Sequence, residues 1–167
     1  MKEPYFLYKE GKIPLNVLYY DQYYCKPEIA TFLIGLLDLS EYDHIIEPCA
    51  GDGAFSLQIP GCEAYDIDPH HESIIKKDFW ELWFEYNPKK TLIIGGPPFG
   101  RHHENAKKFL ERSTMFANTI AFILPDNFKN ITNFKMILEE KLPKDSFTAG
   151  GYPFAYSCSF QVYKKIE

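Results

Sequence analysis

The sequence predicts an α/β protein with a Rossmann-like, doubly wound, mostly parallel sheet of about seven strands and a C-terminal antiparallel hairpin. Short apolar runs bounded by Gly, Pro and Asp clusters are typical of strands buried on both faces. Segments of helical periodicity alternate with these runs, and two further strands follow at the end of the chain. With 167 residues, of which 46% are hydrophobic, the chain is long enough for one domain with its own core.

Composition and charge exclude several classes of protein. The longest apolar run, residues 29–37, is far shorter than the ~20 residues of a membrane helix, and no signal-peptide segment begins the chain. Four cysteines without a CxxC pair fit free thiols in a reducing, cytoplasmic compartment. The net charge of −5 argues against a protein that coats nucleic acid through its overall field, although a local basic patch stays open. The paired histidines lack further ligand spacing, so we expect no metal site. Because the apolar runs are short, we also expect no membrane association.

The chain divides into an aromatic lead-in and one core domain. Residues 1–22 contain many Tyr and Phe side chains between prolines and glycines, and we expect them to pack onto the core of residues 23–167. No separate target-recognition domain is expected. Pro27 begins a helix whose apolar positions, up to Leu37, recur at helical spacing.

The remaining elements follow in order. Buried strands are predicted at residues 44–48, 63–69, 74–80, 92–95 and 119–124. Helices are predicted after the turn at residues 49–56 and over residues 105–113 and 133–141. Residues 144–148 and 158–163 are predicted as the terminal strand pair, joined by a loop at residues 149–154.

A small-residue turn follows the first predicted strand. Gly51 and Gly53 can adopt positive φ and let a ligand approach the backbone. The acidic Glu47 and Asp52 would repel phosphates and favour a ligand that carries an amino group, so the turn is neither a P-loop nor a dinucleotide fingerprint. The alternative is that the segment forms a tight strand-to-helix turn that binds no ligand.

Two further acidic positions end strands. Asp66 ends the second predicted strand, where a carboxylate can accept both hydroxyls of a ribose; a surface turn with an Asp cap is an equal alternative. Asp78 and Phe79 follow the third, where an acid can accept from an adenine amine while the ring covers the base. The alternative, in which Phe79 packs in the core beside a solvated Asp78, is at least as common.

The fourth strand ends in a stiff turn formed by Gly96, Pro97, Pro98, Phe99 and Gly100. The two prolines fix φ at two consecutive positions and remove two backbone N–H donors, so the backbone carbonyls of the turn point in fixed directions. Together with the ring of Phe99, these carbonyls can hold a flat ligand that carries an amine. A rigid loop is the alternative. Downstream, Arg101, Lys107 and Lys108 supply positive charge that could steer a phosphate backbone, or else form a solvated helix face.

Taken in order, four of these segments resemble the motifs of class I S-adenosylmethionine-dependent methyltransferases. The segments are Glu47-Pro48-Cys49-Ala50-Gly51-Asp52-Gly53, Tyr65-Asp66-Ile67-Asp68-Pro69, Asp78-Phe79 and Gly96-Pro97-Pro98-Phe99-Gly100. The similarity is to the adenine amino-methyltransferases whose fourth motif is Asn/Asp-Pro-Pro-Tyr/Phe, and within them to the phage- and virus-type enzymes with an Asn-Pro-Pro-Phe-Gly turn. It covers roughly residues 23–164.

The resemblance implies S-adenosyl-L-methionine as cofactor and the exocyclic amine of adenine, in DNA or RNA, as methyl acceptor. The first segment would approach the methionine part of the cofactor, Asp66 would hold the ribose with Ile67 beside it, and Asp78 and Phe79 would contact its adenine. Residues 24–27 would lie alongside, although Lys26 replaces the usual Thr before Pro27. At the catalytic turn of residues 96–99, the Pro97 carbonyl would accept an N–H of the substrate amine and Phe99 would stack on the flipped base.

One position departs from the family pattern, because Gly96 stands where the family has Asn or Asp. Losing one preorganised hydrogen-bonding group at a reacting centre costs about 10²–10³ in rate. The site could be disabled, water or Asp126 could substitute, or the domain could act without catalysis. The sequence therefore keeps two alternatives open: a non-catalytic subunit that binds cofactor, nucleic acid or an active methyltransferase-fold partner in a homo- or hetero-dimer, and a protein glutamine methyltransferase.

Overall fold

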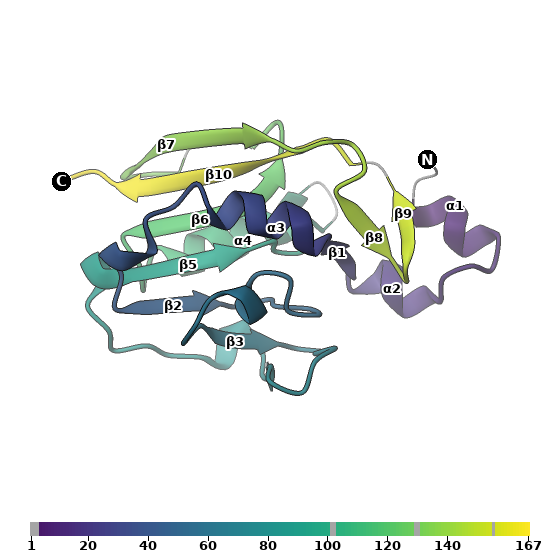
Figure 1. Ribbon diagram of the computed structural model, residues 1–167, viewed down its shortest axis with the longest axis horizontal. Coiled ribbons are helices and arrows are strands. Elements are labelled where there is room, and N and C mark those ends of the chain that lie inside the picture. The colour runs from purple at the N-terminus through teal and green to yellow at the C-terminus, as the bar shows by residue number, and fades with distance from the viewer. Residues whose placement is uncertain (1–3, 101–102, 129–130, 155) are drawn as a thin grey trace.

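The computed structural model describes residues 4–100, 103–128, 131–154 and 156–167 (Figure 1). A seven-stranded sheet forms its centre, in the order β4-β3-β2-β5-β6-β10-β7. Its strands are β2 (His44–Glu47), β3 (Glu63–Asp66), β4 (Ile75–Lys76), β5 (Thr91–Gly95), β6 (Thr119–Pro125), β7 (Phe134–Lys141) and β10 (Cys158–Lys165). Strands β4, β3, β2, β5 and β6 pair in parallel, while β10 is antiparallel to both β6 and β7. The predicted fold class is confirmed.

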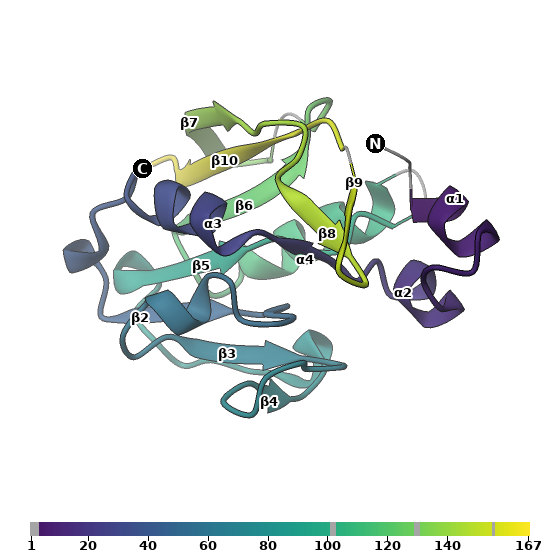
Figure 2. The same cartoon turned by 45° about the vertical axis from the view of Figure 1, so that its right-hand side comes forward.

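A second, smaller sheet lies beside the first. It has three antiparallel strands in the order β1-β8-β9, formed by β1 (Tyr23–Cys25), β8 (Phe147–Ala149) and β9 (Tyr152–Phe154). The N-terminal helices α1 (Pro4–Lys9) and α2 (Leu15–Tyr19) lie next to this sheet at one end of the molecule (Figures 1 and 2). Short 3₁₀ turns at Leu39–Glu41, Ser56–Gln58, Phe79–Glu81 and Pro88–Lys90 connect the strands.

The two faces of the large sheet are covered by different helices. Leu92 and Ile94 of β5 pack in one cluster with α3 (Pro27–Ile34), while the intervening Ile93 packs in another with α4 (Glu104–Ser113). Successive strand residues point to opposite faces, so a strand covered on both sides must be apolar throughout. This explains why the sequence of β5 contains a continuous apolar run.

The N-terminal segment contacts the core mainly through aliphatic side chains. Leu7, Ile13 and Val17 are buried in the cluster on the α3 side, whereas Tyr5 and Tyr19 are more than half exposed. Among the described residues, no helix combines the length and the apolarity that crossing a bilayer requires.

The helix predicted over residues 133–141 is wrong. This segment is the strand β7, which pairs antiparallel with β10 along its whole length. Its burial alternates, with Phe134 buried and Met136 and Leu138 half-buried between exposed neighbours. Leu, Glu and Lys favour helices locally, but pairing with a strand about 24 residues later overrides that preference.

The predicted terminal strand pair is also made differently. The strand expected at residues 144–148 begins at Phe147 as β8 and pairs with β1 and β9, not with β10. The loop expected at residues 149–154 is the tip and second strand of the β8–β9 hairpin, with Gly150 and Gly151 at positive φ in its turn. The antiparallel partner of β10 at the end of the large sheet is therefore β7.

Other predicted elements are shorter or of a different kind, whereas the helix predicted over residues 105–113 is present as α4. After β2 the chain forms a turn and then the 3₁₀ helix Ser56–Gln58, instead of a short α-helix. The strand predicted at residues 74–80 is limited to β4, and its second half is the 3₁₀ helix Phe79–Glu81. Helix α3 ends at Ile34, before the predicted end at Asp38.

Candidate active site

A cavity of about 560 Å³ opens at the carboxyl ends of β2, β3 and β5. This volume lies within the range of roughly 300–1,000 Å³ that small-molecule sites occupy, and the carboxyl edge is where doubly wound sheets bind ligands. The predicted residues that line it are Glu47, Pro48, Cys49, Ala50, Gly51, Asp52, Asp66, Ile67, Asp78, Phe79, Gly96, Pro97, Pro98, Phe99 and Lys108. The fold thus brings together the ends of four separate segments.

The other predicted site residues lie elsewhere. Lys26 and Pro27 are not among the lining residues, and the Lys26 ammonium forms an ion pair with Asp145 at 3.7 Å. Lys107 pairs with Glu111 at 3.8 Å along the exposed face of α4. Gly53 does not line the cavity, and Arg101 lies outside the described residues.

Gly51 is held in a turn that admits no larger residue. Its φ is +58°, and a Cβ there would lie 2.7 Å from Cε1 of the Tyr24 ring. Its N–H donates to Oδ2 of Asp66 at 2.8 Å, and Oδ1 of Asp66 accepts from the Asp68 N–H at 2.8 Å. The carboxylate at the end of β3 thereby fixes the turn that follows β2.

The Tyr24 hydroxyl is buried and has no hydrogen-bond partner among the described residues. Burial, together with the carboxylates of Asp66, Asp52 and Asp68, raises the pKa of this phenol. A buried hydroxyl without a partner costs about 1–3 kcal/mol. Because Tyr24 lines the cavity, a ligand with a polar group could satisfy it.

The cavity is strongly acidic. Five carboxylates line it (Asp21, Glu47, Asp52, Asp66 and Asp78), against the single ammonium group of Lys108 within the described residues. Burial raises the pKa of Glu47 well above its ordinary value, and its Oε2 accepts the Ser56 N–H at 3.0 Å. Burial also raises the pKa of Asp52. Because a positive charge nearby stabilises the ionised form of a buried carboxylate, this lining favours a cationic ligand over a phosphate.

The turn after β5 presents its groups to the same cavity. The Pro97 carbonyl receives no hydrogen bond from the described residues. The Phe99 ring packs against Tyr156 with centroids 4.9 Å apart, and the Gly100 N–H donates to Oδ2 of Asp21 at 2.8 Å. At Gly96 a Cβ would make only ordinary van der Waals contact, with Ile123 Cβ at 3.9 Å, so no neighbour would have to move for it.

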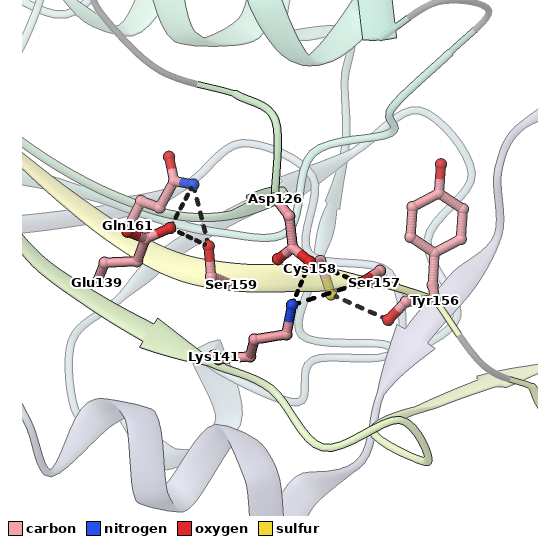
Figure 3. Close-up of polar contacts among 8 residues, drawn as sticks. All are labelled: Asp126, Glu139, Lys141, Tyr156, Ser157, Cys158, Ser159 and Gln161. Carbon is pink, nitrogen blue, oxygen red and sulfur yellow. Dashed lines mark hydrogen bonds and ion pairs between the residues drawn. The ribbon is translucent and has the colours of Figure 1, made fainter.

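Asp126, a candidate substitute for the missing side chain, does not line the cavity. Figure 3 shows its carboxylate turned toward Lys141 and Ser157. The Lys141 ammonium and the Ser157 hydroxyl, which donates at 2.6 Å, hold the pKa of Asp126 below its ordinary value. Its role in the structure is to join β6, β7 and the start of β10.

A neighbouring polar network in Figure 3 is structural. Ser159 donates to Oε1 of Glu139 at 3.0 Å, and the Gln161 amide donates to the Ser159 hydroxyl at 3.0 Å. Ser159 and Gln161 are buried, so these bonds satisfy polar groups in the interior of the sheet.

Sequence reasoning missed several lining residues. The cavity also includes Tyr19, Tyr20, Asp21, Gln22, Tyr23, Trp80, Asn105, Phe109, Phe147, Phe154 and Tyr156. The sequence predicts the segment before β1 as a lead-in without site residues, although the polar Asp21 and Gln22 interrupt its aromatic run. Trp80 directly follows the predicted acid–aromatic pair, which was the available signal for its place in the wall.

No model of a protein family matches the sequence, and no curated protein matches it. Solved structures do match the fold. One is a candidate RNA methyltransferase of Pyrococcus horikoshii, with a TM-score of 0.58 and 14% identity over 83% of this chain and 84% of that one. A candidate methylase of Haemophilus influenzae has a TM-score of 0.53 and 15% identity over 83% and 89%. A candidate methyltransferase of Escherichia coli has a TM-score of 0.53 and 13% identity over 83% and 85%. At these identities the likeness concerns the fold.

Proposed function

We propose that this protein is an S-adenosylmethionine-dependent methyltransferase that acts on the exocyclic amine of adenine in DNA or RNA. One observation carries the proposal: the acidic turn after β2, the carboxylate at the end of β3 and the Pro-Pro-Phe turn after β5 line one cavity. The descriptions of the structural neighbours as candidate methyltransferases or methylases agree with it.

The lining residues fit the cofactor. S-adenosylmethionine carries a sulfonium and an ammonium group, and an opposite charge nearby favours such groups. Asp66 uses one acceptor position on each oxygen, so its carboxylate retains capacity for the ribose hydroxyls. Asp78 accepts the Trp80 N–H at 3.0 Å and likewise retains capacity for an adenine amine. The unpartnered Tyr24 hydroxyl offers a further contact.

The residues of the β5 turn would bind and orient the substrate. When bound, the cofactor supplies a methyl group that is already activated by the sulfonium charge. The Pro97 carbonyl would accept an N–H of the adenine amine, which helps that nitrogen to become pyramidal. Phe99 and Tyr156 would form the aromatic wall on which a flipped base stacks, and Lys108 at the rim would attract the phosphate backbone.

The test is transfer of labelled methyl from S-adenosylmethionine to a panel of adenine-containing DNA and RNA. RNA belongs in the panel because one neighbour is described as a candidate RNA methyltransferase. Native chain and Gly96→Asn are compared, since a Cβ at this position meets no close contact. We expect label in at least the Asn variant. Absence of label in both, with cofactor binding verified by calorimetry, would refute the proposal.

Gly96 also favours a second candidate, a non-catalytic subunit of a methyltransferase-fold dimer. It presents no side-chain acceptor to the cavity, which is compatible with binding without transfer. A stable complex with an intact Asn-Pro-Pro enzyme, seen by size-exclusion chromatography, would support this function. Transfer by the native chain alone would rule it out.

A further inference from the structure

The structure offers a group in place of the side chain that Gly96 lacks. The acceptor must be polar, must line the cavity and must lie beside the turn of residues 96–100. Four of the five lining carboxylates meet these conditions less well than the fifth. Glu47 lies beside the end of β5, since a Cβ at Gly95 would be 3.2 Å from its Oε1, but it is only 2% exposed, burial raises its pKa well above the ordinary value, and it accepts the Ser56 N–H. Asp66 and Asp78 follow β3 and β4, on the far side of β2 from β5, and Asp52 lies in the turn after β2; their hydrogen bonds among the described residues do not reach the turn of residues 96–100.

Asp21 is the remaining carboxylate, and it is bonded to the turn itself. Its Oδ2 accepts the Gly100 N–H at 2.8 Å, across 79 positions of sequence. Both Asp21 and Gly96 line the cavity, as do Pro97 and Phe99. The carboxylate therefore lies against the end of the turn that carries the Pro97 carbonyl and the Phe99 ring, and it faces the same cavity.

The backbone holds Asp21 in a specific conformation. Its φ is +47°, in the left-handed region that Asp tolerates better than most residues. The Asp21 carbonyl accepts the Tyr23 N–H at 2.7 Å, which ties this residue to the start of β1. A carboxylate anchored at both its backbone and its Oδ2 needs little reorganisation to receive a ligand.

The carboxylate retains acceptor capacity. An ionised Asp has about four acceptor positions. The Gly100 N–H and the Tyr23 hydroxyl both hydrogen-bond to it, which leaves about two positions. One of them is sufficient for an amine N–H.

We propose that the Asp21 carboxylate accepts an N–H of the substrate amine and so replaces the side chain absent at Gly96; this inference rests on the proposed function. The amine nitrogen gains a methyl group and must lose one proton, which passes to the Asp21 carboxylate and then to water. The electron pair of the broken carbon–sulfur bond stays on sulfur, and the sulfonium becomes a neutral thioether.

The test measures binding, so it does not depend on turnover. Calorimetry in saturating S-adenosylhomocysteine compares the affinity for adenosine with that for purine riboside, which lacks the exocyclic amine. We expect the native chain to prefer adenosine by about 10–100-fold, the effect of a hydrogen bond to a charged group. Asp21→Asn should lower this preference at least about tenfold, to what the Pro97 carbonyl alone supplies, because its amide can keep the Gly100 bond with its oxygen but turns a donor toward the amine.

Controls separate this effect from damage to the fold. Asn is also tolerated in the left-handed region, so Asp21→Asn should melt within a few degrees of the native chain. Asp126→Asn makes the same chemical change outside the cavity and should keep the preference. Adding Gly96→Asp to Asp21→Asn should restore it, since the new side chain supplies a carboxylate to the turn and its Cβ meets no close contact.

The outcomes distinguish the two proposals. Unchanged preference in Asp21→Asn, or absence of any preference in the native chain, would overturn the role of Asp21. A preference that depends on Asp21, combined with no methyl transfer to any adenine, would support Asp21 as the amine acceptor and count against the proposed enzymatic function.

Discussion

Replacing Gly51 by Ala should damage the cavity, because two independent effects act at this position. The φ of +58° places Ala in the left-handed region, and the new Cβ would lie 2.7 Å from Cε1 and 2.9 Å from Cδ1 of Tyr24. The backbone strain costs about 1–2 kcal/mol, part of which is offset by the smaller entropy of the unfolded chain. Displacing a packed ring costs about another 1–3 kcal/mol.

Gly61 provides the matched control. Its φ is +75°, but a Cβ there would meet nothing within 4 Å. Gly61→Ala should therefore lose only about 1 kcal/mol, or about 2–4 °C in Tm, from strain alone. Gly51→Ala should lose roughly 5–15 °C, and the difference between the two variants measures the displacement of Tyr24.

Two assays check this reasoning, thermal unfolding and calorimetric titration with S-adenosylmethionine. Gly51→Ala should weaken the affinity at least about tenfold, since both the turn and Tyr24 line the cavity, while Gly61→Ala should bind as the native chain does. If the two variants have equal Tm and equal affinity, the close contact between Gly51 and Tyr24 does not shape the site.

Three further predictions follow from other parts of the molecule. Asp66→Ala should weaken S-adenosylmethionine binding roughly 10–150-fold in calorimetry, because a hydrogen bond to a charged group contributes about 1.5–3 kcal/mol; native affinity would exclude Asp66 from the site. Burial raises the pKa of Glu47 well above the ordinary value of a glutamate, so ionisation of this carboxyl lowers the stability of the fold as pH rises through its folded-state pKa. Glu47→Gln should thus raise Tm near about pH 8 and change it little near about pH 4, and a gain confined to acid would contradict this. Asp126→Asn should leave methyl transfer within about twofold of native, since the group is bound to Lys141 and Ser157 outside the cavity; a loss of about 10²-fold would place it at the reacting centre.

The parallel part of the fold was predictable because it depends on local patterns. The β5 and β6 runs are apolar throughout, and their burial on both faces requires that composition. The end of the fold was not predictable in the same way. Whether residues 134–141 form a helix or a strand is decided by β10, about 24 residues further along, and no local signal in the Leu, Glu and Lys composition reports this pairing.

Some residues of the candidate site could likewise be predicted from the sequence, and others could not. Residues that end strands, such as Asp66 and Pro97, could be found because a doubly wound sheet places them at one edge. Asp21 and Tyr156 reach the cavity from segments before and after the parallel strands, through contacts such as the bond between Asp21 and Gly100. Such contacts depend on the path of the whole chain, so only the structure brings these residues to the site.

Methylation of the exocyclic amine of adenine can be tested by mass spectrometry of nucleosides from adenine-containing DNA and RNA treated with deuterium-labelled S-adenosylmethionine and either the native protein or Gly96→Asn. We expect the labelled methyl group on the exocyclic nitrogen of adenine, and we expect Asp21→Asn to lower the yield of the native protein by about 10²–10³-fold. Label on another atom or another base, or no label with either protein in the presence of verified cofactor binding, would contradict the proposed function.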